Sequence, residues 1–137
     1  MMTAKEYLSQ IHSINIRLKS MARQKQSLED SLMNFAPVFS DMPRPASPDI
    51  QRMETLIAAK VDIENEMAEA SSKLVEIHKT IGKIRNAELN ALLTARYIDR
   101  KKWGVIASEL YISLRQVHRL HQEVLAEIDF QLKDVTH

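Results

Sequence analysis

The sequence predicts an all-α protein in two parts: a long antiparallel, coiled-coil-like helical hairpin over residues 1–84, and a three-helix domain containing a helix-turn-helix over residues 85–137. Only two Gly and four Pro occur among 137 residues, and the Pro all lie between positions 37 and 48. On either side of that segment, apolar residues recur at alternating spacings of three and four, which is typical of a coiled-coil seam. Residues 103–122 have the pattern of two helices separated by a tight turn.

The first helix is expected over about residues 3–35. Thr3 and Glu6 form a T-x-x-E capping box at its start. Lys25 fills the one polar position in its apolar seam. Three Pro exclude a continuous helix through residues 36–47, which are therefore expected to form a linker. The seam consists of Tyr7, Ile11, Ile14, Leu18, Met21, Leu28, Leu32 and Phe35.

The second helix is expected over about residues 48–84. Ser47 is a suitable N-cap, and Pro48 suits the first helical position. Lys60 interrupts the seam as Lys25 does in the first helix. Two long helices joined by about a dozen residues should fold back as an antiparallel hairpin. The seam consists of Met53, Leu56, Ile63, Met67, Ala70, Leu74, Ile77, Ile81 and Ile84.

The antiparallel register places Lys25 and Lys60 in one layer. Two ammonium groups cannot be buried together without partners. We therefore expect both side chains to reach toward Glu29 and Glu64, each one helical turn onward.

Four apolar residues fall off the two seams and are expected at the surface of the hairpin. Such a surface would support a homodimer through the hairpin, and a dimer would present two DNA half-sites. The four are Leu8, Ile16, Val61 and Val75.

A shorter helix is expected from a cap at Asn86 to about Tyr97, followed by a polar turn. In the helix-turn-helix that comes next, Ser113 and Gln116 form a capping-box pattern at the start of a helix over residues 114–131. The residues expected to be buried there and to fix the two helices are Ile106, Ala107, Leu110, Val117 and Leu120.

The opposite face of the last helix is the candidate site, with double-stranded DNA as the expected partner. Arg and Gln side chains suit base edges in the major groove, so we expect base contacts from Arg115, Gln116, His118 and Arg119. Phosphate contacts are expected from Arg100, Lys101, Lys102, Ser113 and Gln122. Residues 95–121 hold six Lys or Arg and two Asp or Glu, a local net charge of +4, whereas the whole chain has +1. A basic patch of this kind favours phosphate contact.

Other function classes find little support. The chain has no Cys and no Gly-rich phosphate loop, and its acids are spaced as solvated faces, so we expect neither an enzyme nor a cofactor. His118 and His121 lack a third ligand of comparable quality, so no metal site is expected. No apolar run of 18 residues occurs, so no membrane span is expected. The expected location is the cytoplasm, because a chain without Cys suits a reducing compartment.

From Arg96-Tyr97 and then Trp103 to Leu125, the chain resembles region 4 of the bacterial primary sigma factors. Those factors have an Arg-Tyr pair, a loop, a short helix, a turn and a Ser-led recognition helix. The whole chain is similar to a family of small phage and prophage proteins of Gram-positive bacteria, the DUF1492 or ArpU-like late regulators. The matching segments are TAKEYLSQI, QRM and LLTARYIDRKKWGVIASELYISLRQVHRLHQEVL. The resemblance implies a DNA-binding transcriptional regulator and leaves open a contact with RNA polymerase.

Two residues depart from the sigma pattern. Leu114 stands where sigma factors usually have Arg, so a contact with an ordinary −35 element is in doubt. Tyr111 stands where the turn usually has Gly, so either Tyr111 adopts a positive φ, at a cost of roughly 1 kcal/mol, or the turn has another shape. Trp103 could pack in the core of the small domain or stack on a base. We favour packing in the core.

A second function class stays open. A non-enzymatic adaptor would bind RNA polymerase or a phage protein through the helical hairpin. Salt dependence separates the two functions, because only contacts with phosphates weaken steeply as salt rises.

Overall fold

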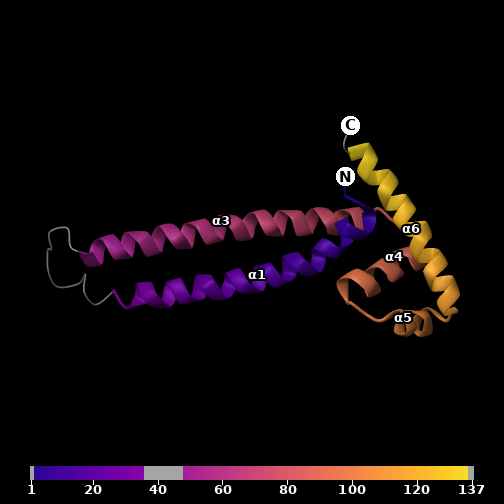
Figure 1. Cartoon of the computed structure of the whole chain (residues 1–137), viewed down its shortest axis with the longest axis horizontal. Coiled ribbons are helices and arrows are strands. Elements are labelled where there is room, and N and C mark those ends of the chain that lie inside the picture. The colour runs from indigo at the N-terminus through magenta and orange to yellow at the C-terminus, as the bar shows by residue number, and fades with distance from the viewer. Residues whose placement is uncertain (1, 36–47, 136–137) are drawn as a thin grey trace. The chain divides into compact units, whose positions relative to one another are not determined.

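A computed structural model describes residues 2–35 and 48–135 of the chain. These residues form five α-helices and one π-helical turn, with no strand among them, which confirms the predicted all-α class (Figure 1). The expected linker at 36–47 lies outside the described residues. The elements are α1 (Ala4–Met33), α3 (Pro48–Gly82), α4 (Ala87–Leu93), η1 (Thr94–Ile98), α5 (Trp103–Leu110) and α6 (Leu114–Val135).

The chain divides into two compact units. One comprises Met1–Ile14 with Lys73–His137, and the other comprises Asn15–Ser72. This division differs from the expected one, which placed a single boundary between residues 84 and 85. The reason is that the first turns of α1 and the last turns of α3 share one apolar cluster with α4, α5 and α6.

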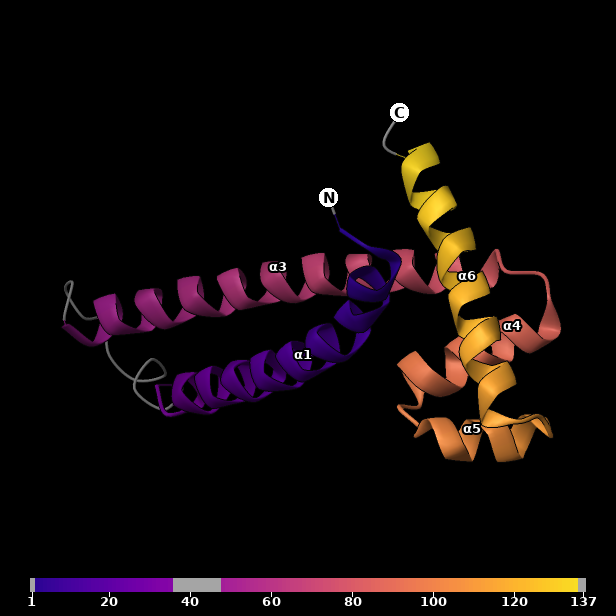
Figure 2. The same cartoon turned by 45° about the vertical axis from the view of Figure 1, so that its right-hand side comes forward.

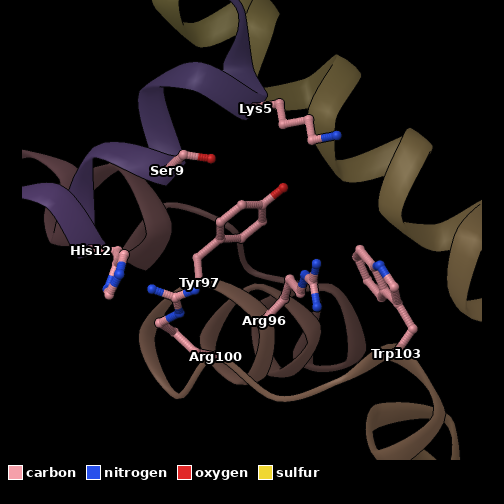
Figure 3. Close-up of a pocket in the computed structure, with 7 residues that line it drawn as sticks. All are labelled: Lys5, Ser9, His12, Arg96, Tyr97, Arg100 and Trp103. Carbon is pink, nitrogen blue, oxygen red and sulfur yellow. The ribbon is translucent and has the colours of Figure 1, made fainter.

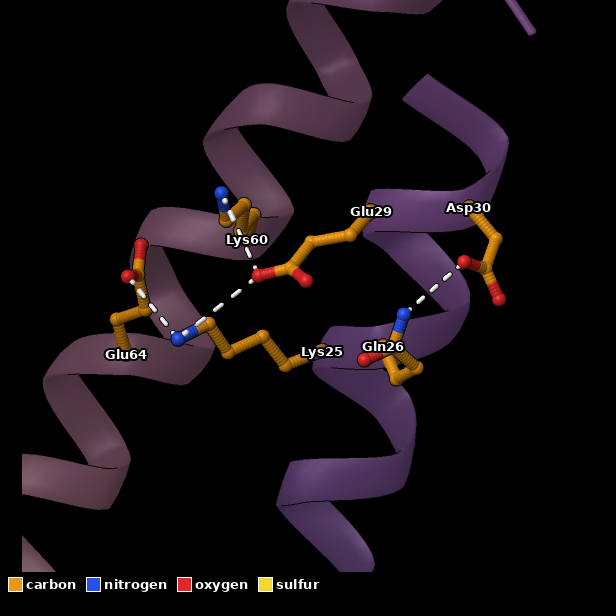
Figure 4. Close-up of polar contacts among 6 residues, drawn as sticks. All are labelled: Lys25, Gln26, Glu29, Asp30, Lys60 and Glu64. Carbon is orange, nitrogen blue, oxygen red and sulfur yellow. Dashed lines mark hydrogen bonds and ion pairs between the residues drawn. The ribbon is translucent and has the colours of Figure 1, made fainter. Parts of the chain in front are cut away.

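In the unit Asn15–Ser72, segments of α1 and α3 are joined by ion pairs (Figure 4). Lys25 Nζ lies 3.9 Å from Glu29 Oε1 and 3.5 Å from Glu64 Oε2, and Lys60 Nζ lies 3.6 Å from the same Glu29 oxygen. The predicted layer of two lysines with these two glutamates is therefore confirmed, with Lys60 paired to Glu29 of the other helix where Glu64, one turn onward, was expected. All four side chains keep about a third or more of their surface exposed, so the ion pairs fix the register more than they add stability.

The off-seam apolar residues have two different fates. Ile16, Val61 and Val75 are about half exposed, as predicted. The prediction for Leu8 was wrong, because its side chain is fully buried. Leu8 belongs to the apolar cluster that also contains residues of α6, and the Ala4 backbone N–H donates to Asp129 Oδ1 of α6 at 2.8 Å. An apolar seam predicted from two helices alone does not include the packing of Leu8 in a cluster with a third helix, α6.

The predicted start of α4 is confirmed by its cap, since Leu89 N–H donates to Asn86 Oδ1 at 3.1 Å. Asn90 Nδ2 donates to the carbonyls of Ile81 and Ile84, at 3.0 and 3.3 Å. These bonds tie α4 to the carbonyl of Ile81 in the last turn of α3 and to that of Ile84 just after the helix. Figure 2 shows α4 and α5 lying against the first half of α6.

The turn between α5 and α6 has a left-handed residue at Tyr111, with φ 58° and ψ 39°. Ile112 N–H donates to the Ala107 carbonyl at 3.1 Å and Tyr111 N–H to the Ser108 carbonyl at 3.3 Å. This is the Schellman pattern, in which Gly is the usual residue at the left-handed position. Of the two expected alternatives, the positive φ is therefore the one observed.

Replacing Tyr111 by Gly should raise the free energy of unfolding by about 1 kcal/mol, because Gly adopts this backbone conformation without a Cβ penalty. The phenol is 94% exposed, so little packing is lost. Urea unfolding followed by circular dichroism measures the change. Tyr111→Ala is the matched control, since it removes the ring and keeps the Cβ. Equal stability of the Gly and Ala variants would contradict the strain.

Candidate nucleic-acid interface

Two helices at a short turn form the candidate interface. Ile106 and Ala107 of α5 and Val117 of α6 are buried, as predicted, while Leu110 and Leu120 are half-buried. The cluster that contains them fixes which face of α6 points inward. The face left exposed contains all the α6 residues predicted to contact DNA: Arg115, Gln116, His118, Arg119 and Gln122.

The predicted capping box at the start of α6 is present. Gln116 N–H donates to Ser113 Oγ at 3.1 Å, and Ser113 N–H donates to Gln116 Oε1 at 3.1 Å. Both side chains are exposed, but the Gln116 oxygen is engaged at the helix start. To make a bidentate contact with adenine, the side-chain amide of Gln116 would have to turn away from the cap. Gln116 therefore has a structural role in the described state.

Arg115 and Arg119 are exposed and one helical turn apart on α6. His118 is also exposed, but its ring centroid lies 5.2 Å from that of Trp103, with the rings tilted by 54°. The two arginines are therefore better placed than the histidine to contact a base.

The residues predicted to contact phosphates differ in their surroundings. Arg100, Lys102 and Gln122 are exposed. Lys101 Nζ donates to both carboxylate oxygens of Glu109 at 2.9 Å, and this hydrogen bond raises the pKa of Lys101. Its charge is thus balanced within the molecule, and the positive charge of this region lies chiefly on its arginines and Lys102.

A cluster of rings and one guanidinium supports the interface from behind. Tyr97 Oη and His121 Nε2 are 2.7 Å apart, and the Trp103 and His121 ring centroids are 4.6 Å apart. The Arg96 guanidinium lies 4.3 Å from the Trp103 ring centroid and donates to the Lys101 carbonyl at 3.0 Å. The indole is half-buried against the core, so Trp103 packs within the protein, as we favoured.

His121 is the residue of this cluster that sequence reasoning missed. Its side chain is buried, and burial, followed by the charges of Lys5, Arg96 and His118, lowers its pKa to about 4. Burial also raises the pKa of Tyr97. The signal was available, because position 121 lies four residues after Val117 and three before Val124, both buried.

Two other kinds of site are absent from residues 2–35 and 48–135. No group of three or more His, Asp or Glu is placed there to hold a metal ion. No helix in this part of the chain is long and apolar enough to cross a membrane.

Comparison with known proteins identifies a family. The family model described as "Protein of unknown function (DUF1492)" matches residues 49–129, which cover the second long helix, the capped helix α4, the turn and most of α6. No curated protein and no solved structure matches the chain. Because the matched region is more than half of the sequence, the chain belongs to the DUF1492 family.

Proposed function

We propose that this protein is a sequence-specific, phage-derived transcriptional regulator that places α6 in the major groove of DNA. One observation carries the proposal: α5 and α6 meet at a three-residue turn, and burial of Ile106 and Val117 leaves Arg115 and Arg119 together on the outer face of α6. Two helices in this arrangement are the element with which helix-turn-helix proteins read base edges. The resemblance to sigma region 4 over the same residues supports the assignment.

In the proposed complex, Arg115 and Arg119 donate to guanine O6 and N7. Leu114, which is about half exposed at the start of α6, suits contact with a thymine methyl group. Phosphates on either side are contacted by Arg100, Lys102, Ser113 and Gln122, which set the position of the helix without reading sequence. Lys101 contributes less, because Glu109 already balances its charge.

The long helices form a hairpin that pairs two copies of the chain in the proposed regulator. Ile57 and Val61 lie one turn apart on α3 and are both nearly half exposed, which gives an apolar strip for a second copy. A dimer would engage two half-sites about one turn of DNA apart. The regulator would act in the bacterial cytoplasm at the nucleoid.

The second candidate is an adaptor that binds RNA polymerase or a phage protein through the hairpin. Ile57 and Val61, which are exposed one turn apart on α3, favour it, because contiguous exposed apolar surface marks protein contacts. This candidate needs no contact with DNA.

Salt dependence of duplex binding tests the proposed function against this alternative. A module that neutralises three to five phosphates should lose roughly 40- to 500-fold in affinity between 50 and 200 mM salt. Fluorescence anisotropy of a labelled duplex measures it. An affinity for duplex that does not respond to salt, or no binding at 50 mM, would favour the adaptor.

A further inference from the structure

We infer that a basic pocket beside the ring cluster binds a small anion that carries one or two phosphate groups. The pocket has a volume of about 240 Å³ and lies within the unit formed by the first turns of α1 and residues 73–137. From α1 it is lined by Lys5, Ser9 and His12. From η1 to the start of α5 it is lined by Arg96, Tyr97, Arg100 and Trp103. This inference does not rest on the proposed contact of α6 with DNA.

The charge of the lining points to an anion. Three of the seven lining side chains are cationic, and none is a carboxylate. Figure 3 shows Lys5 and Ser9 on α1 in the upper part of the view, with Tyr97 pointing up toward that helix from below and Arg96 beside Tyr97. The same cations, Lys5 and Arg96, lower the pKa of His121 behind the pocket, which is the effect expected of a positive potential there.

The donor types point to phosphate rather than to a singly charged ion. Guanidinium groups bind phosphate oxygens through paired N–H donors, and lysine adds a point charge. Ser9 adds a hydroxyl group and His12 adds an imidazole, whereas the Tyr97 hydroxyl is already hydrogen-bonded to His121 Nε2. Several donors around one centre suit a tetrahedral group with several acceptor oxygens.

The size limits the ligand. Pockets that enclose a drug-sized ligand usually have about 300–1,000 Å³. A volume of about 240 Å³ is smaller and suits one or two phosphate groups better than a whole nucleotide.

Arg100, which lines the pocket, has an unusual backbone conformation. This residue has φ 58°, a left-handed conformation that side chains other than Gly rarely adopt. Arg100 directly follows the C-cap of η1, and Lys101 N–H donates to the Ala95 carbonyl at 2.9 Å, so this conformation ends the helical turn as Tyr111 ends α5. The Arg100 side chain is one of those that line the pocket (Figure 3).

The full-length protein offers a native probe, because Trp103 is its only tryptophan and lines the pocket. Titration with inorganic pyrophosphate should change Trp103 fluorescence in a saturable manner, whereas sodium chloride at equal ionic strength should not. Lys5→Gln and Arg100→Gln should each weaken pyrophosphate binding about tenfold. Both residues are exposed, and circular dichroism verifies that the variants fold.

The matched control is Lys19→Gln with Arg23→Gln, which removes two exposed charges of α1 outside the pocket and should leave binding unchanged. No saturable signal in the wild type would overturn the inference. Equal binding by the wild type and both pocket variants would also overturn it.

The phosphate can come from a free small molecule or from the backbone of a bound duplex, and competition separates these sources. If the source is the duplex, pyrophosphate displaces it, and Lys5→Gln lowers the slope of the salt dependence by about 1. If the source is a free anion, both ligands bind together and Lys5→Gln leaves duplex binding unchanged. A protein that binds no duplex at all would refute the proposed function, while the pyrophosphate titration would still be decisive for the pocket.

Discussion

Replacing Arg115 and Arg119 together by Ala should lower the affinity for a preferred duplex by about 30-fold or more. Each bidentate contact between an Arg and a guanine contributes about 1–3 kcal/mol of discrimination, and 1.4 kcal/mol corresponds to a factor of ten. Both side chains are exposed, so helix content and the midpoint of urea unfolding should stay close to the wild-type values. Fluorescence anisotropy at constant salt measures the affinity for preferred and scrambled duplexes.

The chain offers a closely matched control in Lys19→Ala with Arg23→Ala. Like Arg115 and Arg119, these two residues are exposed and four apart on one helix, and their replacement removes two positive charges. The control should leave the preference for the selected sequence intact. If sequence preference survives in the Arg115 and Arg119 variant, the recognition face has been assigned to the wrong residues. If the control loses as much affinity, net charge alone explains the binding.

Acidification should destabilise the protein through His121, by up to roughly 3 kcal/mol. The pKa of this imidazole is 6.5 in its ordinary state and about 4 in the folded protein. Between these values the unfolded chain binds a proton that the folded chain does not, so stability rises with pH in this window. The stabilisation is fully present above pH 6.5 and is lost as the pH falls toward 4. Each unit of difference between the unfolded and folded pKa values corresponds to about 1.4 kcal/mol of stability.

Urea unfolding at intervals from pH 7 to pH 4 measures the effect. Carboxylates also titrate near the lower limit, so the test compares the wild type with His121→Gln, in which this group cannot titrate. The variant should lose most of the slope between pH 5 and 6.5, whereas His78→Gln, at an exposed position, should keep it. A His121→Gln variant with the wild-type slope would contradict the proton linkage.

Features set by neighbouring residues could be predicted from the sequence. The caps at Asn86 and at Ser113 depend on side chains within three residues, and the structure has both. Glu6 N–H likewise donates to Thr3 Oγ1 at 3.2 Å, as the capping box predicts. The layer of Lys25 and Lys60 was predictable because a regular spacing on both helices fixes the register.

Features set by long-range packing were not predictable in this way. Leu8 lies off the seam between the two long helices, yet a cluster with residues of α6 buries it. His121 became a member of a buried ring cluster only because Tyr97 and Trp103, some twenty residues earlier, lie beside it. Helical spacing within α6 places His121 on the inner face but does not name its partners.

The backbone details at two positions were also beyond the sequence pattern. Residues 94–98 form a π-helical turn, and Arg100 has a positive φ. Helix propensity predicts neither feature, because no residue in this segment specifically favours a π-helical turn or a positive φ. The basic pocket depends on both the turn and the first residues of α1, so it emerged only from the folded chain.

Selection from a pool of random duplexes with the purified protein tests the central claim most directly. A regulator that reads bases through α6 should enrich a short motif, as two copies in opposite orientation if the protein binds as a dimer. The enriched motif should contain guanines whose replacement weakens binding to the wild type but not to the Arg115→Ala, Arg119→Ala variant. Recovered sequences no more alike than those of the starting pool would contradict the account.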